Sequence, residues 1–377
     1  MLNLTRDTLV ITLAGSQAHG TAHAESDVDL RGVCIAPLPM RLALFDRFEQ
    51  FEGKLDGPIA EQALRRIEAH PTAHRGLAIK TETVIFDLAK FLTLCTSANP
   101  NTLEILFADE RDWIIETDAW KRLHAHRHRF LTKRVQQTYL GYGMAQLKKI
   151  QSHRAWLLHP PAQKPTRAAF GLPETGTLSR EDQHRIETAI QAKLSEYGID
   201  DIEMPKDTRL ALQARIESLY TDQLQAPDTS TADAMRDLAM QTLALPDAVV
   251  HVLESERRYR AAMKHWESYA KWKVERNPKR ALLELRHGYD TKHAMHLVRL
   301  MKTGLELLTT GELRVRRDDA EELTAIREGA LSYEALLERA QQLQAAMQAA
   351  AKTSTLPASV DAAWVDELAY ALINEAR

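Results

Sequence analysis

Short stretches of β-branched and aromatic residues mark the first part of the chain, up to about residue 110. Stretches of this length and composition favour β-strands. They lie at residues 8–14, 28–36, 48–52 and 81–86. From Leu88 onward the spacing of apolar positions becomes helical, and Asp87 stands in a good position to cap the first helix. The pattern therefore predicts a small sheet that is followed by helices.

Helical spacing then continues through the remaining two thirds of the chain. The expected helices lie at residues 88–95, 120–150, 180–197, 209–224, 248–274, 278–308 and 333–351. Clusters of Pro, Gly, Asp and Ser separate them. We therefore expect an α+β fold, with a small mixed-sheet domain at residues 1–115 and a larger, mainly α-helical domain at residues 116–377.

Composition limits the class of protein. The 377 residues suffice for a large core and for more than one domain. A net charge of -3 excludes a generally basic nucleic-acid coat protein, so any basic surface must be local. Two cysteines, Cys34 and Cys95, provide neither a disulfide framework nor a cysteine-rich metal site. No run of about 18 apolar residues occurs, and the apolar run at residues 10–14 is too short for a signal peptide. We expect a soluble protein of the reducing cytoplasm, with no membrane partner.

Glycines, a serine and two aspartates are grouped around the first two predicted strands. Gly15 and Ser16 end the first strand, Gly20 follows, and Asp27 and Asp29 open the second. Gly15 permits a close approach of the backbone to phosphate groups, to which the Ser16 hydroxyl and nearby amides can donate hydrogen bonds. Because side chains alternate along a strand, Asp27 and Asp29 share one face and can hold one or two hard divalent cations. Each motif alone is common, but their order indicates metal-assisted phosphoryl transfer.

A site with two metal ions usually needs a third carboxylate. Glu82 begins the strand at residues 81–86, and it would complete the cluster if that strand neighbours the one that holds Asp27 and Asp29. Asp87 is the alternative, although its position before a helix favours a role as N-cap. We expect Asp27, Asp29 and Glu82 to be the catalytic, metal-binding carboxylates.

This arrangement resembles the DNA polymerase beta-like nucleotidyltransferase superfamily and, more narrowly, the RNA repair pathway DNA polymerase beta family. The resemblance extends to residues 87–94, 99–107, 165–173 and 288–300. It implies a palm-like catalytic domain in which Gly15 and Ser16 bind a nucleoside triphosphate while Asp27 and Asp29 bind Mg²⁺, or Mn²⁺ in its place. The family pattern leads us to expect an aspartate where this chain has Glu82, which keeps the charge on a longer side chain. The family name also implies RNA, but no motif in this chain identifies the acceptor.

One segment of the helical region is strongly basic. Residues 257–302 contain thirteen Lys or Arg against four Asp or Glu. Aromatic residues are interleaved with these charges, at Tyr259, Trp266, Tyr269, Trp272 and Tyr289. This composition suits phosphate contact combined with stacking on exposed bases. A solvated basic face whose aromatic side chains turn into the core is the alternative.

Within residues 288–300, helical spacing places Lys292, His296 and Arg299 on one face and apolar residues on the opposite one. If this helix packs across the cleft of the sheet domain, Lys292 and Arg299 can clamp phosphate groups. His293 and His296 would then donate hydrogen bonds or act as acid-base groups, with a structural role as the alternative for each. We therefore predict nucleotide binding by Gly15, Ser16, Lys292, His293, His296 and Arg299.

A second basic stretch, at residues 121–134, reads as a charged helix surface. Tyr142, Gln146 and Lys149 follow it at the spacing of one helix face, and they would extend it towards the active site.

The leading hypothesis is an enzyme that transfers a nucleoside monophosphate from a nucleoside triphosphate to a hydroxyl acceptor, in particular an RNA end. The helical domain would complete the cleft for nucleotide and acceptor. Two alternatives stay open: nucleotidylation of a protein or a small molecule, such as AMP transfer, and a nucleotide- or RNA-binding module without catalysis. A P-loop kinase is excluded because no Gly-x-x-x-x-Gly-Lys-Ser/Thr sequence occurs.

Overall fold

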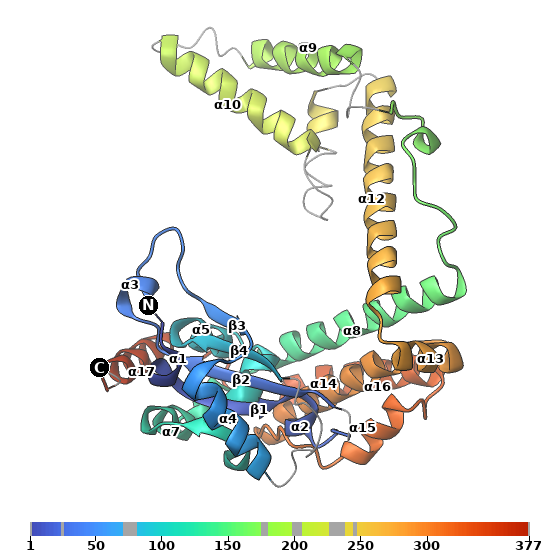
Figure 1. Ribbon diagram of the computed structural model, residues 1–377. Coiled ribbons are helices and arrows are strands. Elements are labelled where there is room, and N and C mark those ends of the chain that lie inside the picture. Colours follow the sequence, from blue (N-terminus) through green and yellow to red (C-terminus); the bar gives the residue numbers. More distant parts are fainter. Residues whose placement is uncertain are drawn as a thin grey trace. The chain divides into compact units, whose positions relative to one another are not determined.

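The computed structural model describes residues 2–23, 26–70, 81–174, 180–197, 206–225, 238–243 and 247–375. Contacts divide the chain into two compact units, drawn in Figure 1. Unit 1 comprises Met1–Leu158 and Pro278–Arg377, and unit 2 comprises His159–Asn277. The expected boundary near residue 115 coincides with the end of the last strand at Glu116, while the compact units group the sheet with the helices that follow it and with the C-terminal helices.

Unit 1 contains a five-stranded mixed sheet in the order β3-β4-β2-β1-β5. The strands are β1 (Thr8–Ala14), β2 (Val28–Cys34), β3 (Gln50–Gly53), β4 (Thr81–Asp87) and β5 (Trp113–Glu116). β2 and β4 are parallel, and the other pairs are antiparallel. The predicted α+β class is therefore confirmed. Sequence analysis missed β5, whose four residues are extended because they pair with β1 at the edge of the sheet.

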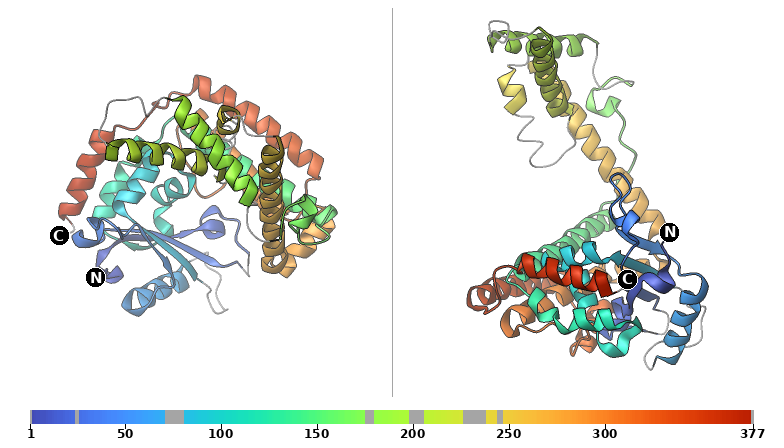
Figure 2. Two further views of the ribbon diagram at one scale, coloured as in Figure 1. Left: turned by 90° about the horizontal axis from the view of Figure 1, so that it is seen from above. Right: turned by 90° about the vertical axis from the view of Figure 1, so that its left-hand side faces the viewer.

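Helices lie on both faces of the sheet (Figure 2). Apolar side chains on each face are buried in one of two core clusters. One face contributes Ile11, Leu30 and Ile85, which pack against α4 (Gly57–Ala69). Leu9 and Val33 belong to the larger core that includes α5 (Leu88–Thr96) and α6 (Pro100–Leu106). Alternation along the strands produces this division, because successive side chains point to opposite faces.

The larger core of unit 1 is centred on α14 (Thr291–Thr310), which packs against α8 (Val135–Leu158) and α16 (Tyr333–Thr353). Two glycines permit these close crossings. A Cβ atom at Gly304 would lie 2.7 Å from Met347 Cε and 2.8 Å from Tyr139 Cβ. A Cβ atom at Gly143 of α8 would lie 3.0 Å from Met301 Cγ. The remaining helices of unit 1 are α1 (Leu4–Asp7), α2 (Gly15–His19), α3 (Leu38–Arg41), α7 (Asp118–Ala125), α13 (Pro278–His287), α15 (Ala320–Arg327) and α17 (Ala362–Glu375).

Two long predicted helices are interrupted. The helix expected at residues 120–150 is divided into α7, a 3₁₀ turn at Arg127–Phe130, and α8. The helix expected at residues 278–308 is divided into α13 and α14. Gly288 adopts a left-handed backbone conformation with φ +74°, and Asp290 caps α14 by accepting a hydrogen bond of 3.1 Å from the His293 amide. Apolar periodicity did not reveal these breaks, since local backbone geometry and capping make them.

Unit 2 has its own small core. Its helices are α9 (Arg180–Glu196), α10 (Lys206–Gln225) and α12 (Asp247–Glu275), with a 3₁₀ turn at Ala168–Phe170. Ile190, Leu194 and Val249 are buried together. Arg167 donates two hydrogen bonds to Glu256, at 3.1 and 2.8 Å, which attaches the 3₁₀ segment to α12. In the described ranges of both units, the helices lack the combination of length and apolar character that a bilayer crossing requires.

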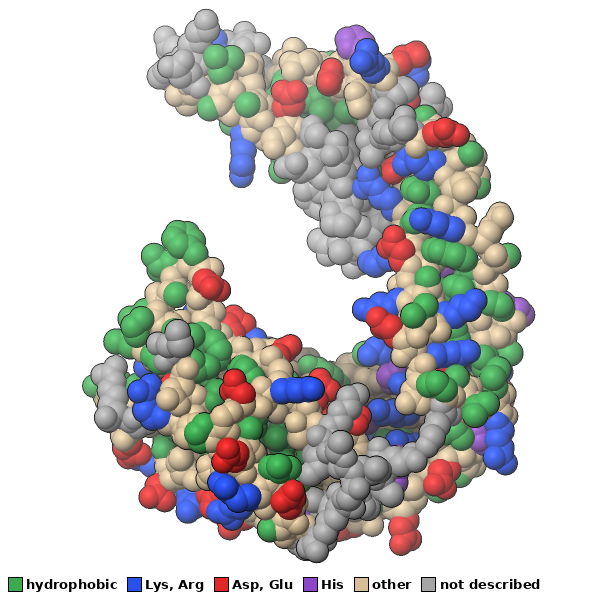
Figure 3. All heavy atoms as spheres, in the orientation of Figure 1, with side chains coloured by type: hydrophobic (Ala, Val, Ile, Leu, Met, Phe, Trp, Pro, Cys, Tyr) green, Lys and Arg blue, Asp and Glu red, His purple; other side chains and the backbone are tan. Residues whose placement is uncertain are grey.

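An apolar tip lies between α3 and β3 (Figure 3). Leu44 and Phe45 are 90% and 101% exposed. These side chains therefore add little to the core of unit 1, and the tip can vary without disturbing the sheet.

The glycine at the crossing of α14 yields a stability prediction. We expect Gly304→Ala to lower the free energy of unfolding by about 1–3 kcal/mol, because its methyl group overlaps Tyr139 and Met347. Gly141→Ala is the matched control, since a Cβ atom there meets nothing within 4 Å and Gly141 lies in the exposed face of α8. That change should raise the free energy of unfolding by about 0.5–1 kcal/mol. Urea unfolding measures both, and equal effects of the same sign would contradict the packing described for α14.

Candidate active site

A cavity of about 590 Å³ lies in unit 1. It is lined by residues of the sheet together with residues of α6, α8, α13 and α14. Among the residues predicted to bind nucleotide or metal, its lining includes Gly15, Asp29, Lys292, His293, His296 and Arg299. Tyr142, Gln146 and Lys149 of α8 also line it. The tertiary structure thus brings together residues from both ends of the chain.

Gly15 lies close to Asp29 at the C-terminal end of β1. Gly15 has a φ of +57°, a left-handed conformation that favours glycine. A Cβ atom at this position would lie 2.2 Å from Asp29 Oδ2. Antiparallel pairing of β1 with β2 causes this approach, because it sets Ala14 opposite Asp29. A side chain at residue 15 would therefore displace the Asp29 carboxylate.

The carboxylates of Asp27, Asp29 and Glu82 lie near one another at the N-terminal ends of β2 and β4. Parallel pairing sets Asp29 opposite Glu82, so both side chains point to the same face of the sheet. Burial raises the pKa of Asp29 above its ordinary value, the Arg31 guanidinium lowers it, and the carboxylates of Glu82 and Asp27 raise it further. Asp27 and Glu82 are exposed, and Asp29 is half-buried. This shared negative charge is an arrangement that a hard divalent cation would stabilise, because carboxylate oxygens are its preferred ligands.

The charges of Asp27 and Glu82 influence Asp29, but the oxygen atoms of the three carboxylates do not converge on one point. In the described part of the chain, the only group of three or more potential ligand atoms within 4.8 Å of one another is elsewhere in unit 1. Ser16, Asp27 and Glu82 lie outside the lining of the cavity. Carboxylate oxygens are suitable ligands for Mg²⁺. Of the three carboxylates, Asp29 is the one that lines the cavity.

Asp87 has a different environment. Its side chain is buried and accepts hydrogen bonds from the amides of Ala89, at 3.1 Å, and Ala36, at 3.2 Å. The first of these bonds caps α5, as the sequence predicted. Because Asp87 stands five positions after Glu82, strand alternation places it on the opposite face of β4. Glu82 is therefore the carboxylate of β4 that shares a face with Asp29.

Cationic groups of α14 line the same cavity as Asp29. Burial lowers the pKa of Lys292, as does the nearby Arg280, while the Asp29 carboxylate raises it. Arg299 is buried and forms an ion pair with Glu104 of α6. On the opposite face of α14, Ala294, Leu297 and Met301 are fully buried, as helical spacing predicted. Thus α14 presents charge to the cavity and apolar side chains to the core.

Glu104 joins two cavity residues. Its Oε2 atom lies 3.0 Å from the Nε2 atom of buried His19, and its other oxygen pairs with Arg299. Burial raises the pKa of Glu104, but the Arg299 guanidinium and His19 outweigh burial and hold this pKa well below its ordinary value. Glu104 therefore stays ionised and holds Arg299 in place.

The two histidines of α14 that line the cavity are kept neutral. Burial lowers the pKa of His296 to about 2, and the charges of Arg299 and Lys292 act in the same direction. Burial lowers the pKa of His293 to about 4, although Asp290 opposes this shift. Both imidazoles are therefore uncharged at neutral pH, so they add hydrogen-bonding atoms to the cavity rather than positive charge.

Sequence reasoning missed several lining residues. They are His19, Arg31, Gln50, Glu52, Asn101, Glu104 and Arg280, among others. Arg31 could have been found, since the alternation that aligns Asp27 with Asp29 extends to it. Glu104 and Arg280 carry no such signal, because they come from separate helices that meet only in the folded chain.

The basic segment at residues 257–302 is divided between the two units. Tyr289 is fully buried, and its hydroxyl donates a hydrogen bond of 2.8 Å to the Leu331 carbonyl. Tyr269 is also buried, and its ring lies 5.7 Å from that of Trp266 and 6.0 Å from that of Trp272. For Tyr289 and Tyr269 the core interpretation is therefore correct, and stacking on bases is not.

The neutral state of His296 yields a pH prediction. Because its pKa is lowered on folding from 6.5 to about 2, the unfolded chain binds one more proton than the folded chain below about pH 6.5. Stability should therefore be lost as pH falls below 6.5, with a slope of up to about 1.4 kcal/mol per pH unit from this group. We expect His296→Gln to make this decline shallower. In the native chain the His296 imidazole resonances should not titrate between pH 8 and pH 5, and a midpoint near pH 6.5 would contradict the burial described.

The N-terminal part of the chain is similar to a known protein family. Residues 5–157 match the sequence model of the family described as the RNA repair pathway DNA polymerase beta family. The matched segment contains the entire sheet, α5, α6 and nearly all of α8, and it confirms the expected resemblance in this part of the chain. Residues 165–173 and 288–300, where the resemblance was also expected, lie outside the match. It supports a polymerase beta-like nucleotidyltransferase, and it ends before α13 and α14, which supply Arg280, Lys292 and Arg299. No match was found among curated proteins. None was found among solved structures.

Proposed function

We propose that the chain is a magnesium-dependent nucleotidyltransferase that moves a nucleoside monophosphate from a nucleoside triphosphate to a hydroxyl group, with an RNA end as acceptor. The observation that carries this proposal is the shared cavity of Asp29 and Gly15 with Lys292 and Arg299. A carboxylate for metal and two cations for phosphate are the parts that phosphoryl transfer requires. The family match over residues 5–157 supports the same reaction class.

The triphosphate would bind between the backbone at Gly15 and the cations of α14. A volume of about 590 Å³ lies within the range of ligand pockets, roughly 300–1,000 Å³. Lys292 contributes a compact charge, and Arg299 contributes a planar group that can donate two parallel hydrogen bonds to a phosphate. The Ser16 hydroxyl, His293 and His296 would add hydrogen bonds to the phosphates or the ribose.

Asp27, Asp29 and Glu82 would hold Mg²⁺ or Mn²⁺, which neutralises phosphate charge and favours ionisation of the attacking hydroxyl. The acceptor oxygen forms a bond to the α-phosphorus, and the bond from that phosphorus to the bridging oxygen breaks, so pyrophosphate leaves. Asp29 or Glu82 would help the metal ion to remove the hydroxyl proton, which passes to water.

In this proposal, residues 1–115 form the catalytic domain, and the helical domain at residues 116–377 completes the cleft for nucleotide and acceptor. We also propose a cytoplasmic location. Cys34 and Cys95 are both buried free thiols, which suits a reducing compartment.

The carboxylate assignments predict a graded loss of activity. Each α-labelled nucleoside triphosphate is incubated with Mg²⁺ and with RNA, tRNA, protein or small-molecule acceptors. We expect Asp27→Asn, Asp29→Asn and Glu82→Gln each to lower label transfer by about 10²-fold or more, as removal of a group that stabilises the transition state does. Glu61→Gln is the matched control, because Glu61 is an exposed carboxylate of α4 outside the cavity lining.

Asp87→Asn separates the two candidates for the third carboxylate. Asparagine is also a good N-cap, so this variant should fold and keep its activity. Full activity of Glu82→Gln together with inactive but folded Asp87→Asn would assign the third ligand to Asp87. Label transfer that persists in Asp29→Asn would exclude the proposed site, and the absence of transfer to every acceptor by the native chain would favour a binding module.

The nature of the acceptor is tested by salt. An RNA acceptor bound through several phosphates should lose affinity by about 10³-fold or more for six to ten contacts as the salt concentration rises from 50 to 200 mM. A small hydroxyl acceptor should show little change. The measurements are filter binding of RNA and the KM for each acceptor over this range of salt concentration. An affinity for RNA that does not change with salt would favour a small-molecule acceptor.

A further inference from the structure

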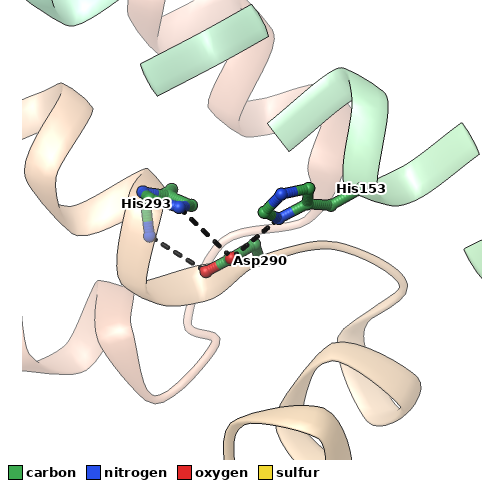
Figure 4. Close-up of side chains that lie close together, drawn as sticks. All are labelled: His153, Asp290 and His293. Atoms are coloured by element: carbon green, nitrogen blue, oxygen red, sulfur yellow. Dashed lines mark hydrogen bonds and ion pairs between the residues drawn. The ribbon is translucent and has the colours of Figure 1, made fainter. Parts of the chain in front are cut away.

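A second group of ligating side chains lies apart from the carboxylates of β2 and β4. It consists of His153 on α8, Asp290 at the N-cap of α14, and His293 on α14 (Figure 4). One ligand atom from each lies within 4.8 Å of the others. His153 Nδ1 is 3.2 Å from Asp290 Oδ2, and His293 Nε2 is 3.7 Å from the same oxygen. The two imidazoles approach one buried carboxylate from different helices.

We propose that His153, Asp290 and His293 bind one transition-metal ion of the zinc class. Zn²⁺ holds nitrogen and oxygen ligands at about 2.0–2.1 Å in a tetrahedron, so two ligands lie about 3.3 Å apart. The spacings of 3.2 and 3.7 Å are close to this value. Imidazole ligands favour Zn²⁺, Co²⁺ or Ni²⁺ over Mg²⁺, which distinguishes this site from the carboxylates around Asp29.

The state of His293 is a second observation that favours a metal ligand. Its Nδ1 atom is buried and has no hydrogen-bond partner in the described part of the chain. Its Nε2 atom is at 3.7 Å from Asp290, which is beyond hydrogen-bond length. An ion on Nε2, the atom that faces Asp290, would supply the strong partner that this atom lacks, while Nδ1 would carry the ring proton. His293 also lines the cavity, so the fourth coordination position can open towards it.

Arg280 is the group with which the ion must compete. Its Nε atom donates a hydrogen bond of 3.2 Å to Asp290 Oδ1, and its terminal nitrogen pairs with Oδ2. A metal ion on Oδ2 would displace the second contact and leave the first. The Lys149 and Lys292 side chains add positive charge nearby. The site therefore needs the stronger bonds that imidazoles make with a transition metal, and Arg280 weakens the affinity.

Metal retention by the full chain tests this site without any nucleotide. The protein is stripped with a chelator, dialysed, loaded with Zn²⁺ and desalted, and its bound metal is measured by mass spectrometry. We expect one tightly held Zn²⁺ per chain, and Co²⁺ in its place should produce the visible absorption of a four-coordinate site. His153→Gln is the decisive variant, because His153 lies outside the lining of the nucleotide cavity. It should weaken binding by at least about tenfold.

Three further variants complete the experiment. His184→Gln removes an exposed histidine of α9 in unit 2 and should retain the metal. Asp29→Asn should also retain it, so the result is independent of the proposed reaction. Arg280→Met should bind more tightly, since the competing cation is absent, and weaker binding would overturn the assignment of Arg280. The site would be overturned if the native chain retained no ion. It would also be overturned if folded His153→Gln and His293→Gln retained as much ion as the native chain. In either case His153 would be only a hydrogen-bond partner of Asp290. Circular dichroism verifies folding.

Discussion

The close crossing of α14 with α8 and α16 is the contact on which the cavity depends. Gly304 and Gly143 bring the helices together at distances that a side chain would prevent. This packing holds Lys292 and Arg299 in the wall that also contains Asp29, more than 260 positions earlier in the chain. Because interiors are densely packed, a shift of α14 would move these cations as one body. The geometry of the site is therefore a consequence of core packing.

Charges in the cavity are balanced pair by pair. An ion buried without a partner is costly, so each buried cation must be matched. Glu104 pairs with Arg299 and His19, and Asp290 pairs with Arg280. His293 and His296 avoid the problem by staying neutral. Asp29 differs, because burial and the Glu82 and Asp27 carboxylates raise its pKa above the ordinary value although Arg31, 3.9 Å away, lowers it. That imbalance is what a divalent cation would relieve.

Two kinds of cation chemistry would thus coexist in unit 1. The oxygen ligands around Asp29 suit a hard ion, while the imidazoles around Asp290 suit a softer one. The two sites are linked by α14, because Lys292 influences Asp29 and His293 follows Lys292 in the chain. Arg280 belongs to both, since it lines the cavity and pairs with Asp290. Such a link would allow occupancy of one site to affect the other.

Local patterns alone determined a large part of this protein. Four of the five strands, the N-cap at Asp87, and the two faces of α14 follow from alternation, capping and helical periodicity, which act within a few residues. These features need no contact between distant segments.

Only the tertiary structure decided the rest. The position of Glu82 opposite Asp29 depends on the register of β2 with β4, which no local pattern specifies. Helix packing brings Glu104 and Arg280 into the cavity lining and His153 close to Asp290, and β5 is a strand because of its pairing with β1. The physical reason is common to all of them. Pairing and packing energies join residues far apart in sequence, so they leave no periodic signal in the chain.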